Sequence, residues 1–92
     1  MKKSYVYILT NKYRTTFYVG MTSNLSKRLI EHYEETASIF TKKYQTKDLV
    51  YFEEFLDIKQ AILREKQLKN WHKDWKINLI KELNPTLETL NY

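Results

Sequence analysis

Glu65 stands where a helix would be expected to present an apolar side chain. Residues 57–71 have the spacing of an amphipathic helix. Glu65 lies three residues before Leu68 and four after Ala61, within the same stripe. The stripe's other members are Ile58 and Ile62. A carboxylate there costs free energy unless it is paired, hydrated in a cleft or bound to a cation. Cation binding and an ordinary salt bridge to a neighbour such as Lys69 are both open hypotheses.

Arg28 and His32 form a second unusual pair. They lie four residues apart, so they share one face of the helix predicted around them. Both fall at the edge of the stripe that carries Leu25 and Leu29, away from the fully polar side. An arginine and a histidine at the edge of a core can face an anionic group, although such a histidine is often only structural.

Tyr7 and Tyr18 lie eleven residues apart on two predicted strands of one hairpin, where they can be neighbours. A tyrosine hydroxyl near a cation loses its proton more easily and can act as a base or orient a reactant. The chain has 8 tyrosines, so most of them fill the core or the surface.

Gly20 is the single glycine of the 92 residues. Average usage of about 7 per cent would give roughly six. It interrupts an apolar strand, eight residues before Arg28 and twelve before His32. The position of this glycine is therefore unusual and asks for a reason.

Three strands are predicted from apolar runs. Residues 4–10, SYVYILT, are apolar on both faces, which indicates a central strand. Residues 16–21, TFYVGM, follow after a short polar turn and complete a hairpin. Residues 49–55, LVYFEEF, are the third strand.

Three helices follow from apolar spacing and capping residues. One begins after Ser23 or Asn24 and fades around Glu35; the others span 57–71, capped by Asp57, and 73–83. Residues 36–47 are expected to be a loop with at most a short helical turn, and 86–92 a loose tail. The order β-β-α-β-α-α predicts an α/β (α+β) fold with a small three-stranded, largely antiparallel sheet flanked by helices. We expect one domain over residues 1–83 and a tail over 84–92.

The charge balance favours a polyanionic partner. Sixteen Lys and Arg face eleven Asp and Glu, giving a net charge of +5. Small basic domains attract nucleic acid. The positive residues are scattered, with doublets that include Lys27-Arg28 and Lys42-Lys43.

Other classes of protein are disfavoured. Without cysteine there is no disulfide and no thiolate zinc site. No apolar run approaches the roughly 18 residues of a membrane span, and the N-terminal apolar piece is too short for a signal peptide. A cytoplasmic location is therefore expected.

Four short segments together resemble the GIY-YIG nuclease superfamily, and more narrowly its small stand-alone bacterial members. These segments are YVY at 5–7, YVG at 18–20, NLSKRLIEH at 24–32 and REKQLKNW at 64–71. The resemblance covers roughly residues 4–83. It implies an endonuclease that hydrolyses DNA phosphodiester bonds with one divalent metal, Mg²⁺ or Mn²⁺.

The resemblance also implies a role for each candidate residue. Glu65 binds the metal, and Tyr18 helps to activate the attacking water. Tyr7 orients that water or contacts the scissile phosphate, Arg28 holds the phosphate, and His32 assists in water activation or contacts the leaving group. Gly20 lets the backbone come close to the site. Candidate substrate contacts are Gly20, Lys27, Lys42 and Lys43.

The sequence departs from the family pattern at several positions. Tyr5 replaces the first glycine, valines replace two isoleucines, and Met21 stands where some repair nucleases have lysine. One carboxylate binds a metal weakly, with water in most positions.

Two other functions remain open on the sequence. One is a nucleic-acid binding module of the same fold that is weakly active or inactive. The other is a structural or interaction protein that is basic by accident. DNA repair, uptake and recombination, DNA against RNA, the preferred DNA structure and the oligomeric state are not determined by the sequence.

Overall fold

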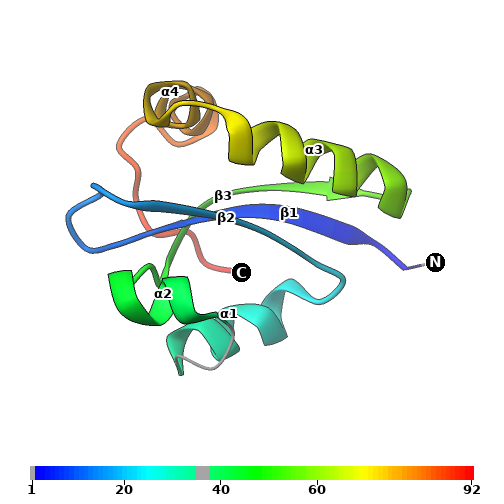
Figure 1. The fold of residues 1–92 in the computed structure, drawn as a ribbon, viewed down its shortest axis with the longest axis horizontal. Helices are drawn as coiled ribbons and strands as arrows, with labels where there is room; N and C mark the ends of the chain where they lie inside the picture. Colours follow the sequence, from blue (N-terminus) through cyan, green and yellow to red (C-terminus); the bar gives the residue numbers. More distant parts are fainter. Residues whose placement is uncertain (1, 35–37) are drawn as a thin grey trace.

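The protein is a three-stranded antiparallel sheet with helices on both faces (Figure 1). A computed structural model describes residues 2–34 and 38–92. Helices α1 and α2 cover one face of the sheet, and α3 and α4 cover the other. The elements are β1 (Ser4–Thr10), β2 (Phe17–Thr22), α1 (Leu25–Tyr33), α2 (Ile39–Tyr44), β3 (Asp48–Phe55), α3 (Ile58–Asn70) and α4 (Lys73–Leu83). The predicted fold class and element order are confirmed.

Strand β1 lies between β2 and β3, as its two apolar faces predict. Tyr7 is the direct cross-strand partner of Gly20, and Leu9 is the partner of Tyr18. Directly paired residues project to the same face of a sheet. The register therefore places both tyrosines and the glycine on one face.

The alternation along β1 divides the buried side chains into two cores. Val6 and Ile8 pack with Ala61, Leu68 and Ile80 on the α3–α4 face. The core on the other face consists of Tyr7, Leu9, Leu25 and Leu49. Each face of β1 therefore contacts its own pair of helices, and residues one position apart in sequence belong to different cores.

The predicted helix starts are confirmed by their caps. The side chain of Asn24 accepts the backbone N–H of Lys27, and that of Asp57 accepts the N–H of Lys59. Such caps satisfy N–H groups that have no partner within the helix. Helix α1 ends at Tyr33; Glu35, where the prediction placed its end, lies outside the described residues.

The predicted apolar stripe of α3 is only half buried. Ala61 and Leu68 are fully buried, whereas Ile58 is 55% exposed and Ile62 is 36% exposed. A helix that lies on one sheet buries a narrow line of side chains and leaves the flanks of a wider stripe in solvent. Glu65 is therefore in a half-buried flank, not in a closed core.

Residues 38–47 contain more structure than a loop. Helix α2 is capped by the Ser38 side chain, which accepts the N–H of Thr41, and ends at Tyr44; the next residue, Gln45, lies in the left-handed region with a φ of 55°. The short helical turn expected there is confirmed.

The C-terminal tail is not loose, contrary to prediction. Leu87 is buried, and the N–H of Leu90 donates to the Leu49 carbonyl at 2.7 Å. From the hairpin loop, Arg14 donates to the Leu87 carbonyl at 2.9 Å and to the Thr89 hydroxyl at 3.0 Å. The prediction failed because it relied on polarity, and these contacts are mainly to the backbone. The proposed boundary at residue 84 remains a prediction.

None of the helices in residues 2–34 and 38–92 is long and apolar enough to cross a membrane.

The hydrogen bonds of Asn84 should let the tail contribute measurably to the free energy of unfolding. Its amide donates to the carbonyls of Val50 and Glu88 and accepts the Glu88 N–H. Asn84→Ala leaves these groups unpaired, so it should lower the free energy of unfolding by about 1–3 kcal/mol in urea denaturation. Asn78→Ala, at an exposed position of α4, is the control and should have little effect. Equal stability of the two variants would contradict a packed tail.

Candidate active site

Tyr7, Tyr18 and His32 form an aromatic cluster between the sheet and α1. The ring centroid of His32 lies 5.6 Å from that of Tyr7 and 5.3 Å from that of Tyr18. The two tyrosine rings are 6.3 Å apart. Three of the predicted site residues are therefore brought together, from β1, β2 and α1.

The hydroxyl of Tyr7 is held by His32. It lies 2.8 Å from Nε2 of the imidazole, and both residues are fully buried. Burial, with the charge of Arg28, lowers the pKa of His32 to about 4. The imidazole is therefore neutral at pH 7 and has a free lone pair for one hydrogen bond.

Gly20 leaves the space that the Tyr7 phenol fills. A Cβ at position 20 would lie 2.4 Å from both Cζ and the hydroxyl of Tyr7, and 2.9 Å from Cε2 of Tyr18. Its φ is not in the left-handed region, so space, not backbone conformation, requires glycine. The side chain is excluded to admit a tyrosine ring, which refines the expectation that it is excluded to admit substrate.

Arg28 is the partly exposed cation of the cluster. Its side chain is 38% exposed, and its Nε lies 3.0 Å from Oε1 of Glu31, one turn further along α1. Burial and Tyr18 raise the pKa of the Tyr7 phenol, and the Arg28 guanidinium opposes this shift. The guanidinium therefore acts on the Tyr7 oxygen while remaining accessible to solvent.

A polar pocket of about 290 Å³ lies beside this guanidinium. It is lined by Thr22, Ser23, Asn24, Lys27, Arg28 and Glu31. Lys27, a predicted substrate contact, thus shares a pocket with Arg28.

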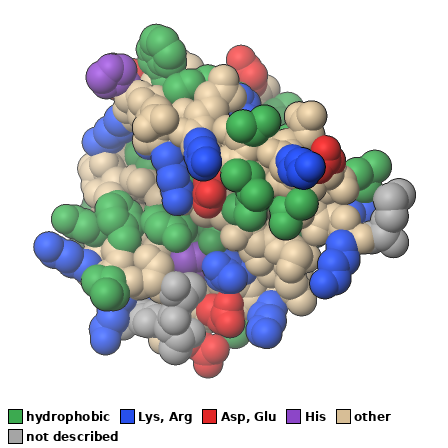
Figure 2. All heavy atoms as spheres, turned by 45° about the vertical axis from the view of Figure 1, so that its right-hand side comes forward, with side chains coloured by type: hydrophobic (Ala, Val, Ile, Leu, Met, Phe, Trp, Pro, Cys, Tyr) green, Lys and Arg blue, Asp and Glu red, His purple; other side chains and the backbone are tan. Residues whose placement is uncertain are grey.

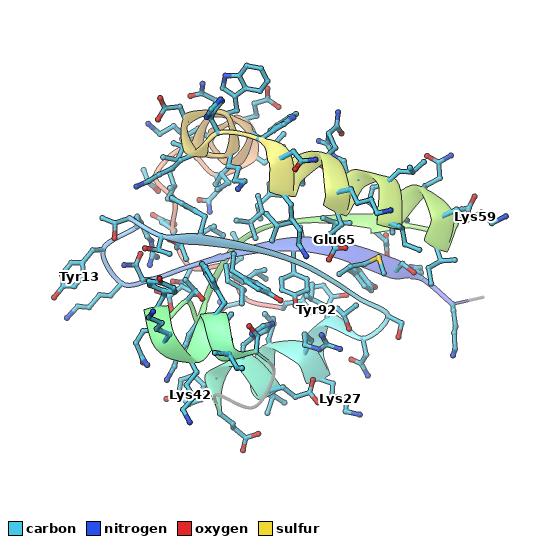
Figure 3. All side chains as sticks on the ribbon, in the orientation of Figure 1. Tyr13, Lys27, Lys42, Lys59, Glu65 and Tyr92 are labelled. Atoms are coloured by element: carbon cyan, nitrogen blue, oxygen red, sulfur yellow. The ribbon has the colours of Figure 1, made fainter. Side chains whose placement is uncertain are left out.

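Glu65 approaches the cluster from the opposite layer. It points from α3 toward the sheet (Figure 3), with its side chain 21% exposed and 3.4 Å from the ammonium of Lys69. Its negative charge also raises the pKa of Tyr7. The salt bridge considered from sequence is therefore present, and the carboxylate also acts on the tyrosine cluster.

The donor set near Glu65 fits a weakly held, hard divalent cation. Among residues 2–34 and 38–92, no group of three or more His, Cys, Asp or Glu side chains could hold a metal. Mg²⁺ nevertheless keeps several waters and is commonly bound through one or two carboxylates and the substrate's phosphates. A single half-buried carboxylate satisfies that requirement.

The predicted substrate lysines do not converge on Glu65. Lys27 and Lys42 project on the outer side of the α1–α2 layer, away from α3 (Figure 3). Lys43 is exposed, and its ammonium lies 5.4 Å from the centre of the Tyr44 ring. On the face in Figure 2, basic side chains alternate with acidic and hydrophobic ones and form no continuous basic patch.

Two contacts of the cluster were missed from sequence. Phe40 packs on Tyr18 with ring centroids 5.6 Å apart, and the Thr41 hydroxyl lies 3.1 Å from Nδ1 of His32. Both residues are in α2, which has too few residues for a clear helical pattern. The available signal was Ser38 three residues before Thr41, the spacing of a helix cap.

The three-stranded antiparallel sheet flanked by helices is consistent with a nuclease-type domain. The sequence pattern of the GIY-YIG catalytic domain matches residues 3–78, and the chain belongs to this family. The resemblance in the four short segments is thereby confirmed.

Small bacterial proteins of similar length are its relatives. UPF0213 protein SSP2268 of Staphylococcus saprophyticus is 33% identical over 82 residues, covering 89% of this chain and 99% of the relative. A UPF0213 protein of Syntrophus aciditrophicus is 37% identical over 86 residues, covering 92% and 97%. UPF0213 protein CPE1444 of Clostridium perfringens is 36% identical over 77 residues, covering 84% and 82%. Their names state no activity. No solved structure is significantly similar to the chain.

Gly20→Ala should displace the Tyr7 phenol. Overpacking of this kind costs about 1–3 kcal/mol, and the hydrogen bond to His32 should be lost with it. Urea denaturation measures the first effect, and the His32 ring signals in an NMR spectrum report the second. Ser23→Ala, at an exposed position just after β2, is the control. A Gly20→Ala protein with wild-type stability and an intact Tyr7–His32 bond would contradict this account.

Because the pKa of His32 is lowered in the fold, the protein should lose stability in acid. Its pKa is about 4 in the fold and 6.5 ordinarily, so the unfolded chain binds more protons between these values. The contribution of neutral His32 to the free energy of unfolding is complete above about pH 6.5. As the pH falls toward 4, the free energy of unfolding should decrease by about 3 kcal/mol. Urea denaturation at pH 7 and pH 4 should show a smaller decrease for His32→Gln than for wild type. His72→Gln, at an exposed position, should decrease as wild type does. An identical decrease in His32→Gln would refute the assignment.

Proposed function

We propose that the chain is a metal-dependent endonuclease that hydrolyses DNA phosphodiester bonds with one divalent metal and an activated water. One observation carries the proposal: Tyr7, Tyr18 and His32, from β1, β2 and α1, form one cluster with ring centroids 5.3–6.3 Å apart. Arg28 and Glu65 shift the pKa of Tyr7 in opposite directions, which supports their place beside this cluster. Tyrosine hydroxyls, a cation and a carboxylate are groups that phosphodiester hydrolysis uses.

Arg28 would hold the scissile phosphate. A guanidinium offers several N–H donors in a planar fork that matches phosphate oxygens. Its partial exposure, beside a polar pocket, gives substrate access to it. Its ion pair with Glu31 would hold the side chain in place before substrate binds.

The two tyrosines would have different tasks. Tyr18 is half-buried, so water can reach it; after its own proton has passed to solvent, its phenolate would accept the proton of the attacking water. Tyr7 is fully buried and its hydroxyl is held by His32, so it would position its neighbours. His32 is also fully buried and neutral, which favours a positioning role for it over contact with the leaving group.

Glu65 would hold the metal ion, Mg²⁺ or Mn²⁺. Such an ion neutralises charge on the phosphate and lowers the pKa of a bound water. The neighbouring Lys69 is 51% exposed and can move into solvent when the carboxylate binds a cation.

The substrate in this proposal is DNA, and the location is the cytoplasm. The net charge of +5 supports a polyanion, and the scattered arrangement of that charge supports binding with little sequence specificity. Branched, flapped and single-stranded DNA remain the candidates to be compared.

The second candidate is a nucleic-acid binding module without useful activity. The Glu65–Lys69 ion pair favours it, since it satisfies the carboxylate without a metal. This module would retain DNA in a salt-dependent way and would not cleave it.

Glu65→Gln should abolish cleavage. Labelled single-stranded, flapped and duplex DNA would be incubated with Mg²⁺ or Mn²⁺, and we expect wild type to cut at least one of them. Loss of the metal-binding carboxylate should reduce the rate by about 100-fold or more. Glu82→Gln, which removes an exposed carboxylate on α4, should cleave as wild type does.

The other outcomes separate the two candidates. Salt-dependent retention of DNA by wild type without cleavage of any substrate would support the binding module and reject the nuclease. Equal cleavage by wild type and Glu65→Gln would identify a contaminating nuclease and also reject the proposal.

A further inference from the structure

We infer that Thr41 is a positioning residue of this site: its hydroxyl fixes the tautomer of His32, and through His32 the direction of the Tyr7 O–H bond. The inference on hydrogen-bond direction stands on geometry alone, and its consequence for catalysis rests on the proposed function.

The hydroxyl of Thr41 has one proton, and its geometry assigns that proton to a backbone carbonyl. Oγ1 of Thr41 donates to the carbonyl oxygen of Ser38 at 3.2 Å. The same Oγ1 lies 3.1 Å from Nδ1 of His32, so it can only accept there. Nδ1 of His32 therefore carries the imidazole proton and donates it to Thr41.

The remaining ring nitrogen must then accept. A neutral imidazole with its proton on Nδ1 has a lone pair on Nε2. Tyr7 lies 2.8 Å from that nitrogen, so its hydroxyl donates to His32. The chain of bonds runs in one direction, from Tyr7 to His32, to Thr41, to the Ser38 carbonyl.

If the hydrogen bond between Tyr7 and His32 ran in the opposite direction, the Tyr7 hydroxyl proton would have no acceptor among the described residues. If His32 donated from Nε2, the Tyr7 proton would need another acceptor, and the described residues supply none. A buried donor without a partner costs about 1–3 kcal/mol. This cost favours the direction that Thr41 sets.

Thr41 is itself rigidly placed. It is fully buried, its N–H donates to the Ser38 hydroxyl at 3.3 Å, and its carbonyl accepts the Thr46 N–H at 3.2 Å. Because the N–H and the carbonyl of Thr41 are both hydrogen-bonded, its hydroxyl is held in one place. A hydroxyl held in this way can select one tautomer of the neighbouring imidazole, as the second partners of metal-bound histidines do.

The consequence for the site is a Tyr7 hydroxyl that is fixed in direction. With its proton committed to His32, the Tyr7 oxygen can only accept any further hydrogen bond. Thr41 would thus position the Tyr7 hydroxyl through His32 without touching substrate.

Nitrogen NMR shifts of the His32 ring test the inference without any substrate. Wild type at pH 7 should show the proton on Nδ1. Thr41→Val keeps the size of the side chain and removes the acceptor, so the proton should move in part or wholly to Nε2. Thr41→Ser restores a hydroxyl and should restore the wild-type tautomer.

Thr46→Val is the matched control. Thr46 is also fully buried, and its hydroxyl has no hydrogen-bond partner among the described residues. The Thr46→Val protein should keep the wild-type tautomer of His32. A wild-type His32 with its proton on Nε2, or a Thr41→Val protein with an unchanged tautomer, would overturn the inference.

Cleavage assays then test the catalytic consequence. Thr41→Val should cleave about 10- to 100-fold more slowly than wild type, with rescue by Thr41→Ser and no effect of Thr46→Val. If the tautomer changes as expected while cleavage by Thr41→Val equals wild type, the positioning role is rejected. If wild type does not cleave at all, the proposed function fails, and the NMR result still decides the hydrogen-bond direction.

Discussion

The site depends on one steric constraint: the phenol of Tyr7 occupies the space that a side chain at Gly20 would fill. Because the two residues are direct cross-strand partners, any larger residue at position 20 would meet the ring. From this space the phenol reaches His32 on α1. A register error of one residue would turn Tyr7 to the opposite core, so strand pairing and site assembly are the same event.

The hydrogen bonds from Tyr7 connect three elements that the sequence separates widely. Tyr7 is in β1, His32 in α1 and Thr41 in α2, and each bond between them is buried. Buried polar chains of this kind are stable only when every member has a partner. The layer formed by α1 and α2 is therefore located on the sheet by hydrogen bonds as well as by apolar packing, and Phe40 adds a ring contact to Tyr18.

The sequence predicted the fold well because the strong signals are local. The apolar residues on both faces of β1, the cap at Asn24 and the cap at Asp57 each require only neighbouring residues, and all three predictions are confirmed. The catalytic roles of the candidate residues remain predictions. Thr41 was missed, because its importance comes from a contact with His32, which lies in a different helix. The packed tail was missed for a similar reason, since its anchor is Arg14, 73 residues before Leu87.

The tail also decides which side of the sheet stays open. The N–H of Leu90 donates to the Leu49 carbonyl, and the side-chain amide of Asn84 donates to the Val50 carbonyl. The C-terminal residues therefore cover part of the outer edge of β3. Strand β2 is the opposite margin. Unpaired strand margins recruit further strands from other molecules. Self-association of this protein by strand addition would therefore start at β2, the strand that carries Tyr18 and Gly20.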